Sequence, residues 1–241
     1  MGSVIVAFSG GIDSSLVLKL AHDELGAQAV GITAVSPTLP ASELDATQKI
    51  AAEIGARHRI VETDQLQIPE FVLNDATRCY HCKTDLYSLL ETLRSEYADG
   101  YIVDGTNVDD LGDDRPGLKA ARERGVRSPL LEAGFSKADI RDVARELHLS
   151  NWDKPAAACL SSRIPRGITI TRSTLSRVER AEDALAQEGF RQYRVRDHGE
   201  IARIELAVEE LLGLLQPGRR ERLAETLKKL GFKVKLGGLT A

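Results

Sequence analysis

Residues 4–25 read "VIVAFSGGIDSSLVLKLAHDEL", and this stretch decides the fold. An apolar run predicts a strand over residues 4–8, and apolar residues at helical spacing predict a helix over residues 14–25. Between them lie two glycines, an aspartate and two serines. Glycines let the backbone approach an anion closely, and the N–H groups at a helix start point at it. Because the lysine of the G-x-x-x-x-G-K-[ST] phosphate loop is missing, the stretch suits a pyrophosphate better than a γ-phosphate in transfer.

The pattern continues as strands alternating with helices, which predicts a parallel sheet covered on both faces, a doubly wound α/β fold. In such sheets, ligands bind beyond the carboxyl ends of the strands. Both "SGGIDSS" (9–15) and "DGTNVDD" (104–110) are expected at that edge. Ser136 and Asp139 have capping-box spacing and predict the start of another helix. The further expected elements are strands over 29–35, 58–63 and 101–106 and helices over 42–54 and from 78 onward, with a loop-like stretch over 107–135.

Three segments are expected along the chain. Residues 1–153 form the α/β domain, and residues 154–170, with small residues, two prolines and no period, form an active-site loop and linker. Residues 171–241 are predicted to form a smaller α+β domain for substrate binding or oligomerisation. Its order is a helix over 172–189, two alternating strands around a His-Gly turn, a helical stretch and a last strand, "FKVKL" (232–236).

Composition narrows the class of protein. The chain has 241 residues, 42% of them hydrophobic, and a formal net charge of −4. This charge argues against a protein that coats nucleic acid. There is no apolar run long enough to span a bilayer and no signal peptide before the first strand, so we expect a cytoplasmic protein with no membrane partner. An odd number of cysteines in such a chain argues against a disulfide framework.

The three cysteines, Cys79, Cys82 and Cys159, are candidate metal ligands. If the loop that carries Cys159 folds over the nucleotide, three thiolates could converge, and such soft ligands suit zinc or an iron–sulfur cluster. Zinc would need a fourth ligand, for which His81 is poorly placed between its neighbours. A [4Fe–4S] cluster on three cysteines keeps one iron open for a hydrosulfide. A redox pair and purely structural cysteines are the alternatives.

The motif S-G-G-x-D-S resembles the PP-loop of the ATP pyrophosphatase superfamily, and Gly-Thr-Asn after a central strand resembles the second nucleotide-contacting segment of that family. The resemblance implies that ATP is held by its β,γ-pyrophosphate while a nucleophile attacks the α-phosphate. Asp13 is the expected Mg²⁺ contact. Asp109 and Asp110 are either metal ligands or helix caps. The expected nucleotide-binding residues are Ser9, Gly10, Gly11, Asp13, Ser14, Ser15, Gly105, Thr106 and Asn107.

Several separate blocks of the sequence resemble the LarE family of sulfurtransferases. The resemblance extends from the first strand to the last. These blocks are "FSGGIDSSLV", "RCYHCKTDLY", "DGTNVDDLGDDRPGLKAA", "SPLLEAGFSKADIR", "WDKPAAACLSSRIPRG" and "RVRDHGEIARIEL". The resemblance implies adenylation of a carboxylate of pyridinium-3,5-biscarboxylic acid mononucleotide, followed by displacement of AMP by sulfur during synthesis of the nickel-pincer nucleotide cofactor. It implies catalytic roles for Cys159, Asp13 and Ser14.

The source of sulfur differs within that family. In members with one relevant cysteine, the thiol that matches Cys159 is the sulfur donor and ends as dehydroalanine. Members that also have cysteines at the positions of Cys79 and Cys82 are associated with a [4Fe–4S] cluster, which would use an external sulfide or other sulfur donor. The resemblance also implies a homo-oligomer.

The substrate carries a phosphate and a second carboxylate, for which guanidinium groups are suitable partners. Arg163, Arg166, Arg194 and Arg196 are the candidates, and the last two lie on one face of a predicted strand. Two other enzyme classes use the same loop. A tRNA thiolase is disfavoured because the chain lacks a basic extension with interleaved aromatics, and an amide-forming ligase would not need three cysteines.

Overall fold

The computed structural model describes residues 1–112 and 116–233. It divides the chain into two compact units, Met1–Ala157 and Ala158–Ala241. Each unit has its own hydrophobic core. The two units are therefore taken in turn.

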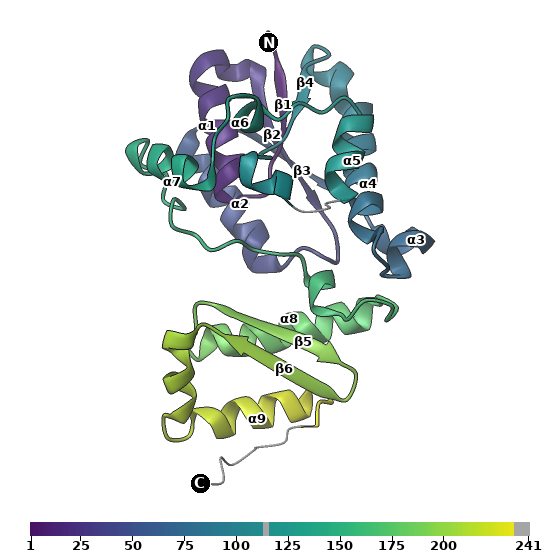
Figure 1. Ribbon diagram of the computed structural model, residues 1–241, viewed down its shortest axis with the longest axis vertical. Coiled ribbons are helices and arrows are strands. Elements are labelled where there is room, and N and C mark those ends of the chain that lie inside the picture. Colours follow the sequence, from purple (N-terminus) through teal and green to yellow (C-terminus); the bar gives the residue numbers. More distant parts are fainter. Residues whose placement is uncertain (113–115, 234–241) are drawn as a thin grey trace. The chain divides into compact units, whose positions relative to one another are not determined.

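The first unit is built on a parallel sheet of four strands in the order β3-β2-β1-β4 (Figure 1). The strands are β1 (Val4–Ala7), β2 (Ala29–Val35), β3 (Arg57–Glu62) and β4 (Tyr101–Val103). Strand β1 is central, because Val4 is in register with Ala29 on one side and with Tyr101 on the other. This confirms the predicted doubly wound α/β fold.

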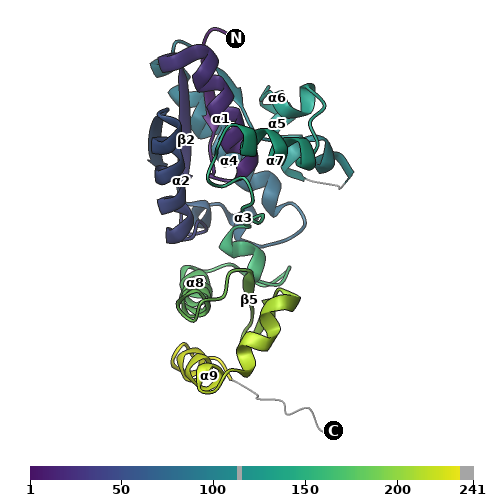
Figure 2. The same ribbon diagram turned by 90° about the vertical axis from the view of Figure 1, so that its left-hand side faces the viewer.

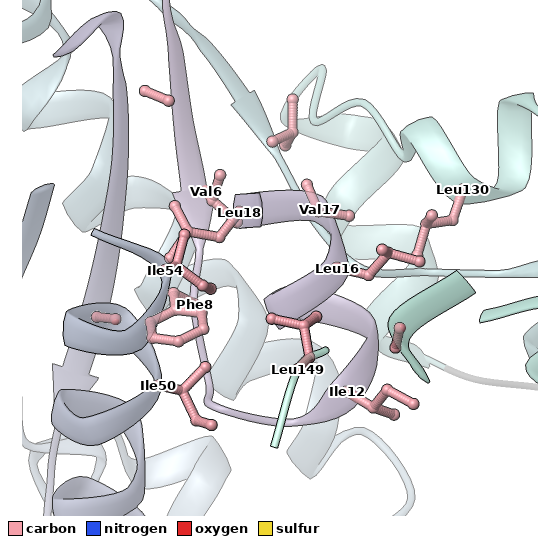
Figure 3. Close-up of a cluster of buried hydrophobic side chains, with 14 of the residues drawn as sticks. Val6, Phe8, Ile12, Leu16, Val17, Leu18, Ile50, Ile54, Leu130 and Leu149 are labelled. Carbon is pink, nitrogen blue, oxygen red and sulfur yellow. The ribbon is translucent and has the colours of Figure 1, made fainter. Parts of the chain in front are cut away.

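Side chains of β1 alternate between two cores, as the period of a strand requires. Val4 and Val6 face a cluster shared with helices α1 (Ile12–Leu25), α2 (Ala41–Ile54) and α7 (Lys137–Glu146) (Figure 3). Ile5 faces the opposite cluster, shared with α4 (Arg78–Leu93) and α5 (Pro116–Glu123). In Figure 1, α1, α2 and α7 lie to the left of the sheet and α4 and α5 to its right, and Figure 2 shows the same helices turned by 90°. Helices therefore cover both faces of the sheet, as the sequence predicts.

Two differences from the sequence-based expectation lie between residues 101 and 135. Strand β4 ends at Val103 rather than at residue 106. The stretch expected to be loop-like contains α5 and the single turn α6 (Pro129–Glu132), both of which begin with a proline at a helix start. With eight and four residues, these helices are too short for an apolar period to predict them. The remaining short helix is α3 (Pro69–Val72).

The second unit contains α8 (Arg172–Gln187), an antiparallel pair of strands and α9 (Arg219–Lys229). The strands are β5 (Tyr193–His198) and β6 (Ile201–Leu206). Its core joins Leu185 of α8, Val195 of β5 and Leu227 of α9. The predicted helix, strand, strand, helix order is confirmed. The predicted last strand extends into 234–236, which lie outside the described residues. Among the residues described, no helix is both long and apolar enough to traverse a bilayer.

Candidate active site

The loop between β1 and α1 requires glycine at Gly10 for two reasons. Its φ angle is +69°, in the left-handed region that favours glycine, and a Cβ atom there would lie 2.8 Å from Cγ2 of Thr47 on α2. Gly11 is the N-cap of α1, and no described side chain caps this helix. Its first N–H groups therefore face the carboxyl edge of the sheet without a capping oxygen, as an anion-binding helix start requires.

The serines of the loop hold its shape. The Ser14 hydroxyl accepts a hydrogen bond from the Ser9 backbone N–H at 3.2 Å and donates to the Gly11 carbonyl at 3.1 Å. Ser15 is fully buried, and its hydroxyl accepts a bond from the side-chain amide of Asn151 at 2.9 Å. The same Asn151 amide donates to the Gly10 carbonyl at 3.0 Å. Asn151, 141 residues from Gly10, is thus a buried support of the loop that could not be predicted from the sequence.

The second predicted segment, residues 105–107, packs directly on the loop. A Cβ atom on Gly105 would lie 2.7 Å from the Ser14 nitrogen and 2.9 Å from Cβ of Asp13. The amide of Asn107 lies 3.5 Å from Asp13 Oδ1. The structure therefore brings the two segments that the sequence analysis singled out to one place, although contact with a nucleotide stays a prediction.

A buried carboxylate, Asp104, fixes the start of that segment. It accepts hydrogen bonds from the Thr106 N–H at 3.1 Å, the Ser128 hydroxyl at 2.7 Å and the Tyr87 hydroxyl at 3.0 Å. Burial, helped by the neighbouring Asp104 charge, raises the pKa of Tyr87 far above its usual range. The phenol therefore stays protonated and donates to Asp104 throughout the physiological range.

Asp109 and Asp110, left open as metal ligands or caps, both accept backbone N–H groups. Asp109 accepts the N–H of Lys137, the first residue of α7, at 2.7 Å. Asp110 accepts the N–H of Asn107 at 3.1 Å. The predicted capping box of α7 is present, with Ser136 and Asp139 exchanging hydrogen bonds. These contacts favour a structural role for the two aspartates.

One charged residue of this site, Lys137, was not predicted from the sequence. Its ammonium nitrogen lies 2.6 Å from both carboxylate oxygens of Asp13 (Oδ1 and Oδ2), the expected Mg²⁺ contact. The side chains of Lys137 and Asp13 are 32% and 27% exposed, so the pair is partly accessible to solvent. Because 124 residues separate Lys137 from Asp13, no local motif could have revealed it.

The cysteines are divided between the two units. Cys79 and Cys82 lie in the first turn of α4, three residues apart and so on one face of the helix. Cys79 is exposed and Cys82 is half-buried. Cys159 precedes a 3₁₀ turn, η5 (Leu160–Arg163), in the second unit. Within residues 1–112 and 116–233, no three His, Cys, Asp or Glu side chains group closely enough to hold a metal ion. The convergence of the three thiols stays a prediction.

A buried ion pair holds the segment around Cys159. The Arg163 guanidinium donates to both carboxylate oxygens of Glu182, at 2.8 and 3.1 Å, and the two side chains are 7% and 11% exposed. Its remaining donors reach the carbonyls of Ala158 at 2.6 Å and Cys159 at 3.2 Å. In this conformation, Arg163 positions the backbone of Cys159.

The side chains of the other three candidate arginines, Arg166, Arg194 and Arg196, are more exposed than that of Arg163. Arg194 and Arg196 flank the buried Val195 and so share the opposite face of β5. Arg196 donates to Glu205 at 2.8 Å and to the Ser162 carbonyl at 3.0 Å, which ties β5 to the Cys159 segment. Arg166 is exposed. Binding of the substrate by these residues stays a prediction.

Comparison with protein families gives a match to the model described as asparagine synthase, over residues 2–90. This stretch contains the phosphate loop and three of the four strands of the parallel sheet. It ends before Lys137, Asn151 and Cys159.

Three curated relatives match almost the whole chain. A protein of Lactiplantibacillus plantarum named pyridinium-3,5-bisthiocarboxylic acid mononucleotide synthase is 40% identical over 239 residues, 98% of this chain and 86% of that protein. A protein of Synechocystis, described as uncharacterized, is 46% identical over 95% of this chain and 85% of its own length. A protein of Methanocaldococcus jannaschii, also described as uncharacterized, is 31% identical over 95% of this chain and 86% of its own length.

Proposed function

The chain belongs to the LarE family, that of the pyridinium-3,5-bisthiocarboxylic acid mononucleotide synthase, and on this premise we propose that it is an ATP-dependent sulfurtransferase acting on a pyridinium mononucleotide. The observation that carries the proposal is the alignment with the Lactiplantibacillus synthase across 98% of the chain. The phosphate loop, which Gly105 and Asn151 hold in place, supports it. Tight packing of this kind suits a site that must position phosphates.

The first half of the reaction is adenylation. A substrate carboxylate attacks the α-phosphorus of ATP, the bond to the bridging oxygen breaks, and pyrophosphate leaves. Ser9 to Ser15 would hold the β- and γ-phosphates through backbone N–H groups of the loop and of α1. Mg²⁺, carried by the nucleotide, would bind Asp13, whose carboxylate is the kind of ligand that this ion prefers.

In the second half, sulfur replaces AMP. With Cys159 as donor, its thiolate displaces AMP to give a thioester. Loss of the Cα proton and cleavage of the Cβ–S bond then release the thiocarboxylate and leave dehydroalanine. Arg163 would hold the Cys159 backbone during these steps, since it donates to the carbonyls of the peptide bonds before and after Cys159.

Cys79, Cys82 and Cys159 are the residues that would hold a [4Fe–4S] cluster, whose open iron would supply a bound hydrosulfide as the sulfur source. The chemistry of the donor set fits, because thiolates are the usual ligands of such clusters. Cys79 and Cys82 lie on one helix face in accessible positions, as two ligands of one cluster would. We also propose that the protein acts on a small-molecule substrate, uses a sulfur donor, forms a homo-oligomer and is located in the cytoplasm.

The experiment follows both products of ATP. Purified protein is incubated without oxygen with ATP, Mg²⁺, sulfide and the biscarboxylic acid mononucleotide. We expect AMP, pyrophosphate and a thiocarboxylate product by mass spectrometry, and none with Asp13→Asn. Formation of ADP, or of AMP without the mononucleotide substrate, would contradict the proposal. An amidated product would instead indicate the ligase alternative.

Iron analysis and mass spectrometry of the protein distinguish the two possible sulfur sources, a cluster-bound hydrosulfide and Cys159 itself. With a cluster, Cys79→Ala and Cys82→Ala each abolish iron binding, whereas Ser88→Ala on the same helix keeps it. With a sacrificial Cys159, the protein loses one H₂S in mass for each product formed and both variants stay active for one turnover. Either variant retaining a full cluster would show that the ligands are wrongly assigned.

A further inference from the structure

The Lys137–Asp13 pair places a cation in a phosphate loop whose own sequence lacks one. Nζ of Lys137 lies 2.6 Å from both carboxylate oxygens, and the pair is only partly exposed. Another lysine with similar geometry, Lys19, pairs with Asp23 one turn further along the surface of α1 in an ordinary i,i+4 pair. The Lys137 pair instead joins two separate helices at the carboxyl edge of the sheet.

The backbone of Lys137 is fixed while its side chain can turn. Asp109 accepts the Lys137 N–H at 2.7 Å, and Asp109 is itself held by a bond from its own N–H to Asn107 Oδ1 at 3.0 Å. The Asn107 amide then reaches Asp13. The second nucleotide segment, the start of α7 and the phosphate loop thus form a closed ring. A four-carbon lysine stem on such an anchor can move its ammonium by several ångströms through bond rotation.

Electrostatics requires a cation at this point. Asp13 lies in the first turn of α1, where a negative charge is favoured. A phosphate at the same helix start would repel that carboxylate, because two negative charges a few ångströms apart in a partly desolvated site interact unfavourably. A divalent cation between the carboxylate and the phosphate removes the repulsion. Once a metal holds Asp13, the Lys137 ammonium would need another anion, and phosphates bound at the start of α1 would provide one.

We propose that Lys137 supplies the lysine that the loop lacks, exchanging Asp13 for β- or γ-phosphate oxygens when Mg²⁺ and nucleotide bind. The inference rests on the proposed use of ATP at this loop, and it adds a phosphate-binding residue from α7. It also explains how a loop with an acidic residue at its helix start accepts a polyanion. The same ammonium neutralises Asp13 in one state and the departing pyrophosphate in the other.

The test is a calorimetric comparison of ligands that do or do not carry the outer phosphates. Wild type, Lys137→Met, Lys137→Gln and Lys19→Met are titrated with Mg²⁺-pyrophosphate, with Mg²⁺ and a non-hydrolysable ATP analogue, and with AMP. Loss of one charge-assisted bond predicts roughly ten- to hundredfold weaker binding of pyrophosphate and analogue by both Lys137 variants. AMP binding stays as in wild type. Lys19→Met, which removes the same charge from a similar pair, leaves all three affinities unchanged.

The outcomes separate this inference from the proposed function. If wild type binds pyrophosphate and both Lys137 variants bind it equally well, Lys137 only neutralises Asp13 and the inference is wrong. If pyrophosphate and AMP binding fall together with the melting temperature, the pair is structural and the inference is again wrong. If wild type binds neither pyrophosphate nor the ATP analogue, the proposed function itself fails, and the inference with it.

Discussion

Gly105 lies so close to Ser14 that a Cβ atom added to it would stand 2.7 Å from the Ser14 backbone nitrogen. The neighbouring atoms are backbone and Cβ atoms of the phosphate loop, which cannot turn aside as a long side chain could. The Gly-Thr-Asn segment and the phosphate loop are therefore positioned against each other by the lack of a single side chain.

Gly105→Ala is expected to displace the loop. Overpacking of this kind costs about 1–3 kcal/mol in the free energy of unfolding, and ATP binding should weaken with it. Urea denaturation and calorimetry measure the two effects. Gly2→Ala is the matched control, because a Cβ atom there meets nothing within 4 Å. Equal stability and ATP affinity in the two variants would contradict the close packing.

Asn151→Ala should destabilise the loop from the other side. The change removes the donor of two buried hydrogen bonds, to Gly10 O and Ser15 Oγ, at a cost of about 1–3 kcal/mol. Thermal or urea unfolding reports the loss. Gln67→Ala, which removes an exposed side-chain amide, should change stability by less than about 0.5 kcal/mol. An Asn151 variant as stable as the Gln67 variant would refute the role given to Asn151.

Arg163→Met should both destabilise the second unit and expose Cys159. It leaves the buried Glu182 carboxylate without its cation, which costs about 3–5 kcal/mol. In a Cys79→Ala, Cys82→Ala background, alkylation by iodoacetamide then reports on Cys159 alone, and we expect it to become faster. Arg166→Met, in the same segment but exposed, should change neither quantity. Unchanged alkylation in the Arg163 variant would show that Arg163 does not hold the segment.

His58 gives stability a dependence on pH. Its ring nitrogen lies 2.8 Å from the Thr33 hydroxyl, and burial lowers the pKa of His58 below its ordinary value of 6.5. The unfolded chain therefore binds a proton before the folded protein does, so stability falls as the pH drops through 6.5 towards the lower folded value.

The pH effect can be measured by urea denaturation between pH 8 and pH 5.5. His58→Gln should flatten the decline of the unfolding free energy over this range. His198→Gln, at an exposed histidine, should leave the decline as in wild type. The assignment to His58 fails if the His58 variant shows the full wild-type slope.

The sequence predicts the sheet well because β1, β2 and β4 are short apolar runs and the long helices α1, α2 and α4 separate successive strands. The strand over residues 29–35 and the helix over 172–189 are found with almost the expected bounds. Local motifs also identify the loop at Gly10 and the segment at Gly105. Short-range pattern is sufficient for such elements because their cause is local.

The parts that could not be predicted depend on contacts far along the chain. Lys137 and Asn151 reach the phosphate loop from 124 and 141 residues away. Lys137 lies in the block "SPLLEAGFSKADIR", but nothing in that block indicates a contact with Asp13. The sequence suggests Arg163 as a residue for an anionic substrate, which stays a prediction, but it does not indicate the ion pair with Glu182. A guanidinium has the same sequence signature whether or not it has an internal partner, so this contact needed the structure.

Asn151 has a consequence for the order in which the protein is made. The residues matched to the asparagine synthase model, 2–90, include the whole phosphate loop. Yet the carbonyl of Gly10 and the hydroxyl of Ser15 find their partner only when Asn151 arrives. A chain emerging from the ribosome therefore has a phosphate loop that lacks this partner until residue 151 has been synthesised. A fragment that ended at residue 90 would leave both of these buried loop atoms without the Asn151 amide.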